Sequence, residues 1–292
     1  EDAIVSLRLG EGTSHHGLIG GGTGGGKSTL LHTLIMSSML HYSPDQLHLY
    51  LMDFKGGTEF KVYESERLPH IQLLALDAMQ EFGESILQNL AEEMEKRSTE
   101  FKNAGGYTKL EDYVRGTGKA MPRILVIMDE FQILFDDSTN RKVAMRSANH
   151  AKRIVTEGRA YGVHLLMATQ STNIINTLAL DRGTIEQMRI RIGLKCGEDD
   201  ARYLFSDRYD RDAMDKMVGP KGTAVMNPDY TEQFGNTGLR VAYCDSENKA
   251  KYLKQISKQF AGYVCKTQIF EGSRTEKLLD SYASQNIQNT GT

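Results

Sequence analysis

The chain has 292 residues, of which 39% are hydrophobic and 25% charged, ordinary proportions for a globular protein. Its 35 lysines and arginines against 38 aspartates and glutamates leave a net charge of −3, which excludes nucleic-acid binding through a histone-like basic arm but not through a local basic surface. Glycine is in excess, with 28 residues against a usual proportion of about 7%.

The cysteines and the short apolar runs bear on the compartment. The three cysteines, Cys196, Cys244 and Cys265, are widely spaced and odd in number, which excludes a disulfide framework and favours a reducing, cytoplasmic setting. No stretch approaches the roughly 18–20 apolar residues that a membrane span requires. Because the chain begins with Glu1 and soon reaches its first motif, we expect a piece of a longer protein, with any attachment to the inner face of a membrane made through missing domains.

Short apolar runs alternate with longer helical patterns, an order typical of a parallel sheet with helical crossovers. We expect strands at Leu18-Ile19, Leu47–Asp53, Ile71–Leu76, Arg123–Asp129, Val163–Thr169 and Met188–Lys195. We expect helices over Thr29–Leu40, Ala78–Lys102, Arg141–Arg159 and Glu247–Phe260. The fold class is therefore α/β, a mostly parallel central sheet flanked by helices.

The glycine excess is concentrated in one loop. The segment Gly21–Ser28 reads Gly-Gly-Thr-Gly-Gly-Gly-Lys-Ser and matches the phosphate-loop pattern G-x-x-x-x-G-K-[ST] between an expected strand and an expected helix. Its backbone N–H groups and the positive end of the helix favour a phosphate, whereas a flexible glycine linker would lack those flanking elements. The residues expected to bind ATP are Gly21, Gly22, Thr23, Gly24, Gly25, Gly26, Lys27, Ser28 and Thr29.

Two adjacent acids end a later apolar strand. In open α/β sheets, ligands bind at the carboxyl ends of the strands, which is where Asp129 and Glu130 fall. We expect Lys27 to reach the β- and γ-phosphates, Ser28 and Asp129 to hold Mg²⁺, and Glu130 to orient and deprotonate the attacking water. Taken alone, the acids are equally typical of a buried strand with a capping carboxylate. Paired with the phosphate loop, they indicate hydrolysis.

Three further motifs extend this pattern: Leu51–Gly57 (Leu-Met-Asp-Phe-Lys-Gly-Gly), the acidic strand Val126–Phe131 and the segment Glu157–Gln170. With them, the chain resembles the FtsK/SpoIIIE branch of hexameric RecA-like motor ATPases from about His16 to Tyr243. The resemblance implies a RecA-like P-loop NTPase fold and a homo-hexameric ring that hydrolyses ATP with Mg²⁺. It also implies an ATPase domain over residues 1–262, followed by a tail or a linker to a missing domain over residues 263–292.

The resemblance implies two further catalytic roles. Arg159 matches the arginine that family members project into the neighbouring subunit's ATP site, although its position alone favours a helix-end arginine. Gln170 matches the family's sensor position beside the γ-phosphate, and its alternative is a polar residue that closes a strand. Asp53 and Lys55 belong to a signature of this branch, and a turn organised by Gly56-Gly57 explains them equally well.

The cargo is the open question. Family membership predicts double-stranded DNA. The alternative is a protein substrate, as for the EccC/EssC ATPases of type VII secretion, which the segments Asp53–Gly57, Leu68–His70 and Glu92–Tyr113 resemble. Ser171 and Glu198 replace basic residues that many DNA-pumping members carry. Five basic residues could compensate, although their positions favour solvated charges at the ends of helices and strands: Lys195, Arg189, Arg191, Arg182 and Lys109.

A third hypothesis is a degenerate nucleotide-binding module that assembles a complex without turnover. The intact set of Lys27, Ser28, Asp129, Glu130 and Arg159 argues against it. The residues after Gly222, including Gly235-Asn236, are expected to complete the sheet and the nucleotide pocket, but no adenine contact can be named. Residues Ser281–Thr292 are expected to form a frayed tail or a linker.

Overall fold

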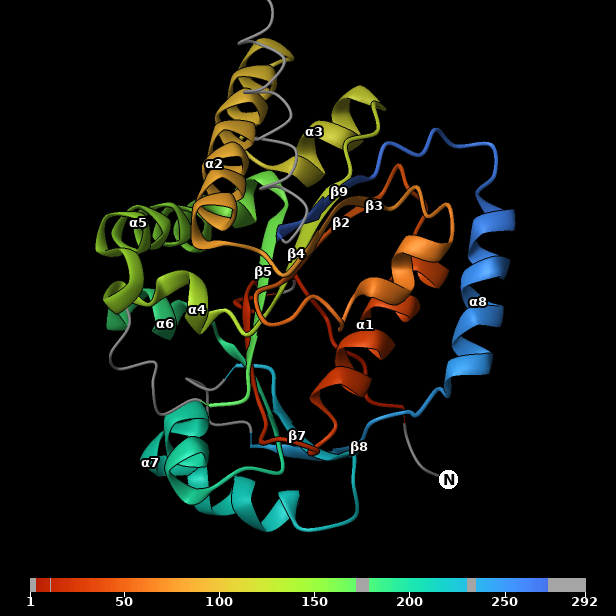
Figure 1. Ribbon diagram of the computed structural model, residues 1–292. Helices are drawn as coiled ribbons and strands as arrows, with labels where there is room; N and C mark the ends of the chain where they lie inside the picture. Colours follow the sequence, from red (N-terminus) through yellow and green to blue (C-terminus); the bar gives the residue numbers. More distant parts are fainter. Residues whose placement is uncertain (1–3, 11, 172–178, 230–234, 273–292) are drawn as a thin grey trace, which may run out of the picture.

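The apolar runs expected as strands lie side by side in one sheet in the computed structural model (Figure 1). The structure describes residues 4–10, 12–171, 179–229 and 235–272, with residues 207–209 described by their backbone alone. The sheet has the order β8-β7-β6-β1-β5-β4-β2-β3-β9, in which the β6–β7 and β7–β8 pairs are antiparallel and the other pairs parallel. The strands are β1 (Gly17–Gly20), β2 (Leu47–Asp53), β3 (Ile71–Leu76), β4 (Arg123–Asp129), β5 (Val163–Thr169), β6 (Ile190–Leu194), β7 (Thr223–Asn227), β8 (Thr237–Arg240) and β9 (Gln268–Glu271).

Helices cover both faces of this sheet (Figure 1). They are α1 (Lys27–His41), α2 (Gln80–Asn103), α3 (Leu110–Thr117), α4 (Gln132–Phe135), α5 (Asp137–Tyr161), α6 (Arg182–Gln187), α7 (Glu198–Met217), α8 (Ser246–Gln259) and the 3-10 helix η1 (Lys61–Ser65). One core lies under α1, η1 and α8, and the other under α2, α4, α5, α6 and α7.

Strand β4 shows why the central strands read as continuous apolar runs. Ile124, Val126 and Met128 pack into the core under α2 and α5, while Leu125 and Ile127 pack into the core under α1 and α8. A strand buried on both faces has no solvent side, so hydrophobic and polar residues do not alternate along it.

The α/β architecture and its main elements are confirmed. The bounds of β2, β3, β4 and β5 are those expected, and α1, α2, α5 and α8 differ from expectation by a few residues at their ends. Strands β7 and β8 lie after Gly222 and complete the sheet, as expected. Helix α7 was not expected, because Ser206 (φ +60°) interrupts its helical periodicity and its composition is strongly charged.

The segment expected to be a tail contributes to the sheet. Strand β9 pairs in parallel with β3 over Leu73–Leu76, and Phe270 stacks on Phe82 of α2 with ring centroids 3.7 Å apart. The edge of the sheet at β3 is therefore covered by chain beyond residue 262. The expected tail over Ser281–Thr292 lies outside the described residues.

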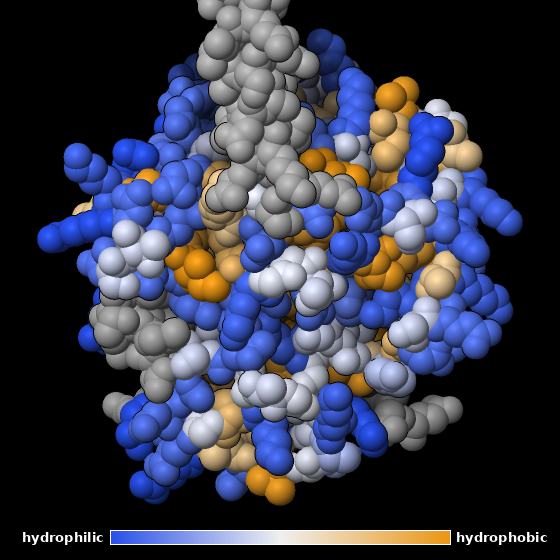
Figure 2. Space-filling model, viewed as in Figure 1, coloured by the Kyte–Doolittle hydropathy of each residue, from blue (hydrophilic) through white to orange (hydrophobic). Residues whose placement is uncertain are grey.

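Polar side chains dominate the face of the molecule in Figure 2, on which apolar side chains form small separate patches. Within the part of the chain that the structure describes, no helix is both long enough and apolar enough to cross a membrane.

Three histidines meet where β1 and β5 begin. The His164 ring centroid lies 6.4 Å from that of His15 and 6.1 Å from that of His16, and His164 Nδ1 lies 2.9 Å from the His15 carbonyl oxygen. Burial lowers the pKa of His164 to about 4, and it holds the pKa of His16 well below its ordinary value. These rings are therefore neutral in the folded protein at pH 7.

Acid should destabilise the protein through these histidines. Because the folded-state pKa is depressed, protonation favours the unfolded chain, and stability is lost as the pH falls from about 6.5 towards 4. Between pH 7 and pH 5, we expect His164 alone to cost about 2 kcal/mol of unfolding free energy. Urea denaturation at both pH values should show a smaller loss for His164→Gln than for wild type. His41→Gln, at an exposed histidine, should keep the wild-type loss, and equal losses in all three proteins would contradict the assignment.

Candidate nucleotide-binding site

The phosphate loop lies between β1 and α1, at the carboxyl edge of the central strands. Its backbone is held by hydrogen bonds from Gly21 N to the Thr169 carbonyl (3.2 Å) and from Gly22 N to the Lys195 carbonyl (3.0 Å). Gly26 has φ +110°, and a Cβ built on it would lie 3.3 Å from the Gly222 Cα. Glycine is thus required where the loop turns into α1 beneath Gly222.

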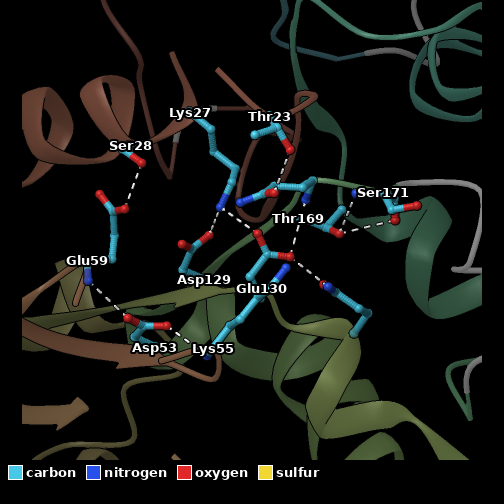
Figure 3. A network of polar contacts seen from close by, with 12 residues as sticks. Thr23, Lys27, Ser28, Asp53, Lys55, Glu59, Asp129, Glu130, Thr169 and Ser171 are labelled. Atoms are coloured by element: carbon cyan, nitrogen blue, oxygen red, sulfur yellow. Dashed lines mark hydrogen bonds and ion pairs between the residues drawn. The ribbon is translucent and has the colours of Figure 1, made fainter. Parts of the chain in front are cut away.

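Three charged residues that the sequence predicted to bind ATP·Mg²⁺ or catalyse its hydrolysis lie together at this loop. Lys27 Nζ forms an ion pair with Asp129 Oδ1 and lies 3.0 Å from Glu130 Oε1 (Figure 3). Lys27, Asp129 and Glu130 are 4%, 4% and 2% exposed. Strand β4 is separated from β1 by β5 alone, which brings its two terminal acids to the loop. Sheet order therefore joins residues about a hundred positions apart.

The pKa values separate the two acids. Burial outweighs Lys27 at Asp129 and raises the pKa of that carboxyl to about 6. Burial also raises the pKa of Glu130, but the hydrogen bond from Gln132 and the charge of Lys27 outweigh it, so the net shift is downward. For Lys27, the two carboxylates outweigh burial and raise the pKa. Glu130 is therefore ionised at neutral pH and chemically able to accept a proton.

Glu130 is held in an unusual backbone conformation. Its φ of +53° lies in the left-handed region, which residues with a Cβ rarely adopt. The carboxylate oxygen Oε2 accepts hydrogen bonds from Gln132 Nε2 (2.6 Å) and, at 3.4 Å, from Gln170 N. In this conformation Glu130 Oε1 lies 3.0 Å from Lys27 Nζ.

Gln170 links the acidic pair to the glycine loop. Its side-chain Oε1 accepts a hydrogen bond of 3.1 Å from the Thr23 hydroxyl, while its backbone N–H reaches Glu130. This contact with the loop agrees with a sensor role, which stays a prediction. The segment 172–178 that follows lies outside the described residues.

Arg159 does not join the others. It is exposed near the end of α5, at the edge of the sheet where β5 begins, whereas the phosphate loop contacts the end of β5. The seven residues of β5 separate these edges by about 20 Å. Arg159 therefore cannot reach the phosphate loop of its own subunit.

Sequence reasoning missed one acidic residue of the site. The Ser28 hydroxyl donates a hydrogen bond of 2.6 Å to Glu59 Oε2 (Figure 3). Glu59 stands at the end of the turn after β2, in which Asp53 accepts hydrogen bonds from Lys55 N (2.8 Å) and Glu59 N (3.1 Å). These bonds agree with the turn interpretation of the Asp-Phe-Lys-Gly-Gly signature. The only sequence signal for Glu59 was an acid two residues beyond that signature.

A pocket of about 170 Å³ opens beside the first turns of α1. Its lining joins α1 to the chain that enters α8, and consists of Ser28, Thr29, His32, Thr33, Tyr243, Cys244, Ser246 and Lys249. The chain after Gly222 thus reaches the site, both through this pocket and through the hydrogen bond from Gly222 N to the Gly25 carbonyl (3.3 Å).

The donor atoms suit Mg²⁺. Ser28 and Asp129 offer hard oxygen ligands, the type that Mg²⁺ prefers. Among the described residues, no group of three or more His, Cys, Asp or Glu side chains could hold a metal ion by itself. Mg²⁺ would accordingly be held by Ser28 and Asp129 together with phosphate oxygens of the nucleotide.

The basic residues considered for cargo contact differ in environment. Arg191 is buried and donates a hydrogen bond to the Ile185 carbonyl (2.7 Å), so it is available neither for cargo contact nor as a solvated charge. Arg189 pairs with Asp229 at 3.1 Å, and Arg182 pairs with Glu186 at 2.7 Å. Lys195 and Lys109 are exposed.

A glycine phosphate loop at the carboxyl edge of a mostly parallel sheet, with a strand-end acid pair beside it, defines a RecA-like P-loop ATPase domain. Residues 2–120 match the FtsK/SpoIIIE family, and the chain therefore contains a domain of that family. The chain is 32% identical over 266 residues to the ESX secretion system protein YukB of Bacillus subtilis, covering 88% of this chain and 16% of YukB. It is 31% identical over 191 residues to the ESX secretion system protein EccC of Thermomonospora curvata, covering 63% of this chain and 14% of EccC.

Solved structures show the same fold. The cytoplasmic domain of the type VII secretion ATPase EccC from Thermomonospora curvata has a TM-score of 0.66 at 25% identity, over 88% of this chain and 29% of that one. The pCW3 conjugation coupling protein TcpA has a TM-score of 0.65 at 22% identity, over 83% of this chain and 65% of that one. The resemblance to RecA-like motor ATPases is confirmed. The chain spans only about one sixth of the length of YukB.

Proposed function

We propose that this domain hydrolyses ATP·Mg²⁺ as part of a secretion-type motor that acts on polypeptide substrates. The observation that carries the proposal is the convergence of Lys27, Asp129 and Glu130 at the glycine loop. The chain that holds them aligns with a secretion system protein over 88% of the chain's own length. The relatives favour this function over the double-stranded DNA translocation that family membership alone predicted, and they do not support DNA binding.

The residues divide the chemistry among them. The backbone N–H groups of residues 21–28 cradle the phosphates, and Lys27 leaves its ion pair with Asp129 to contact the γ-phosphate. When bound, Mg²⁺ neutralises charge on the β- and γ-phosphate oxygens. Glu130 accepts the proton of the attacking water, while Gln170 detects the phosphate through its bonds to Thr23 and Glu130.

Arg159 acts on the neighbouring subunit in this proposal. Because it lies about 20 Å from its own phosphate loop, it can contact a γ-phosphate only across an interface in which one subunit's β5-entry edge faces the next subunit's loop. A head-to-tail interface forms a ring when the rotation between subunits closes, and we propose a ring of six subunits. Hydrolysis would then depend on assembly.

The nucleoside has one evident place. The pocket beside α1 adjoins Ser28 and Thr29, so a nucleotide with its phosphates on the loop would direct its ribose and base along α1 towards Tyr243 and Lys249. Tyr243 is 79% exposed and offers an aromatic face without displacement of core residues.

Cargo choice can be tested with the assembled protein. We expect the ATPase rate to be unchanged by duplex DNA and raised several-fold by polypeptides that the host exports, with a particle mass that indicates a hexamer. Stimulation by duplex DNA that falls steeply with salt would restore the DNA hypothesis, because neutralising phosphates releases counterions. Salt-insensitive stimulation by polypeptide alone would support the secretion function.

A further inference from the structure

The contact between Ser28 and Glu59 places a carboxylate at the predicted magnesium site. Ser28 is the predicted hydroxyl ligand of Mg²⁺, and Glu59 accepts its hydrogen bond at 2.6 Å. The Glu59 side chain is only 19% exposed. Glu59 is therefore within one hydrogen bond of the expected ligand sphere.

The turn after β2 fixes the backbone of Glu59. Asp53 binds its N–H group, and Gly56 N donates to Asp77 Oδ1 at 3.1 Å. Gly57 has φ +63°, and a Cβ there would lie 2.9 Å from Asp77 N, so a side chain at this position would displace the turn. The signature whose role was open thus serves to bring Glu59 to the phosphate loop.

Two further side chains fix the carboxylate of Glu59. His32 Nε2 lies 3.3 Å from Glu59 Oε1, and His32 Nδ1 lies 2.8 Å from the hydroxyl of buried Tyr63. Burial, and secondarily the charge of Lys249, lowers the pKa of His32 to about 4, so the ring is neutral at pH 7. With Tyr63 donating to Nδ1, the ring proton is on Nε2, which faces Glu59 Oε1 at 3.3 Å.

We propose that Glu59 is a magnesium-site residue: it accepts the Ser28 hydrogen bond before the nucleotide arrives and then hydrogen-bonds a water of the bound Mg²⁺, held in place by His32 and Tyr63. Mg²⁺ is usually held by one or two carboxylates and keeps several waters. Asp129 supplies one carboxylate and Glu59 the second. This inference rests on the proposed nucleotide-binding function.

The test is a Mg²⁺ titration of nucleotide binding, which does not depend on turnover. With a fluorescent ATP analogue at fixed concentration, Glu59→Gln should raise the Mg²⁺ concentration for half-maximal binding about tenfold, the scale of losses at residues around a metal's ligands. Binding of the analogue in EDTA should equal that of wild type. Tyr63→Phe should shift the titration in the same direction by a smaller factor, because His32 loses the partner that orients it.

Glu64→Gln is the matched control, because Glu64 is an exposed acid on η1, the 3-10 helix that directly follows the turn. Its titration should match wild type. An unchanged or lower half-maximal Mg²⁺ concentration in Glu59→Gln would overturn the proposal, a lower value showing that Glu59 merely competes with the metal for Ser28. Wild-type protein that binds no ATP analogue at all would instead overturn the proposed function.

Discussion

Glu130→Gln should lower the ATPase rate about a thousandfold while ATP·Mg²⁺ binding stays close to wild type. General-base catalysis typically contributes about 10²–10⁴-fold, and a glutamine amide cannot accept the proton of the attacking water. Glutamine has nearly the same shape as glutamate. The replacement therefore removes the negative charge from the contacts of residue 130 with Gln132 and Gln170 without leaving a cavity. Steady-state hydrolysis and equilibrium binding of an ATP analogue should be measured on the same preparation.

Lys27→Ala is the informative comparison for this experiment. It removes the ammonium group that contacts both acids, so we expect it to lose nucleotide affinity as well as turnover. Wild-type turnover in Glu130→Gln would show that another group activates the water. A wild-type protein that binds ATP but hydrolyses none would instead revive the hypothesis of a degenerate module.

Arg159→Ala should lower the rate of ATP hydrolysis by a factor of about 10³–10⁵, which abolishes detectable turnover, without loss of ATP binding. The exposed side chain lies at the opposite edge of the sheet from its own phosphate loop, so its removal leaves the binding groups intact. If it acts across the interface, mixing Arg159→Ala with Lys27→Ala subunits should restore activity. In an equal random mixture, about a quarter of the interfaces would join an intact loop to an intact arginine.

Arg153→Ala provides the matched control on the same helix. Arg153 pairs with Glu95 at 2.6 Å and with Glu157 at 3.5 Å, within its own subunit. Exposed pairs of this kind contribute little to stability, and the variant should keep full activity. Mixed subunits that stay inactive would count against an arginine acting in trans.

The candidate site was partly visible in the sequence because its chemistry is local. The backbone of the phosphate loop, its lysine and its serine occur within eight residues, and the acid pair follows an unmistakably apolar strand. Glu59 was not visible, because its contact with Ser28 spans 31 positions and depends on a turn whose shape the Asp53 hydrogen bonds create. The burial of Arg191 was not visible either, because it depends on the packing around β6, where the guanidinium donates a hydrogen bond to the Ile185 carbonyl of α6.

By itself, the sequence determined the glycine loop, the bounds of the central strands β2 to β5 and the α/β class. A strand that is buried on both faces has apolar side chains on both sides, so each central strand is visible as a continuous apolar run. The excess of glycine is largely the phosphate cradle: six of the seven residues 20–26 are glycine. Only the tertiary structure decided that β5 alone separates β1 from β4, that β9 covers the β3 edge and that Arg159 faces away from its own loop. The physical reason is that strand order and edge position arise from packing between distant segments, which no local pattern of residues records.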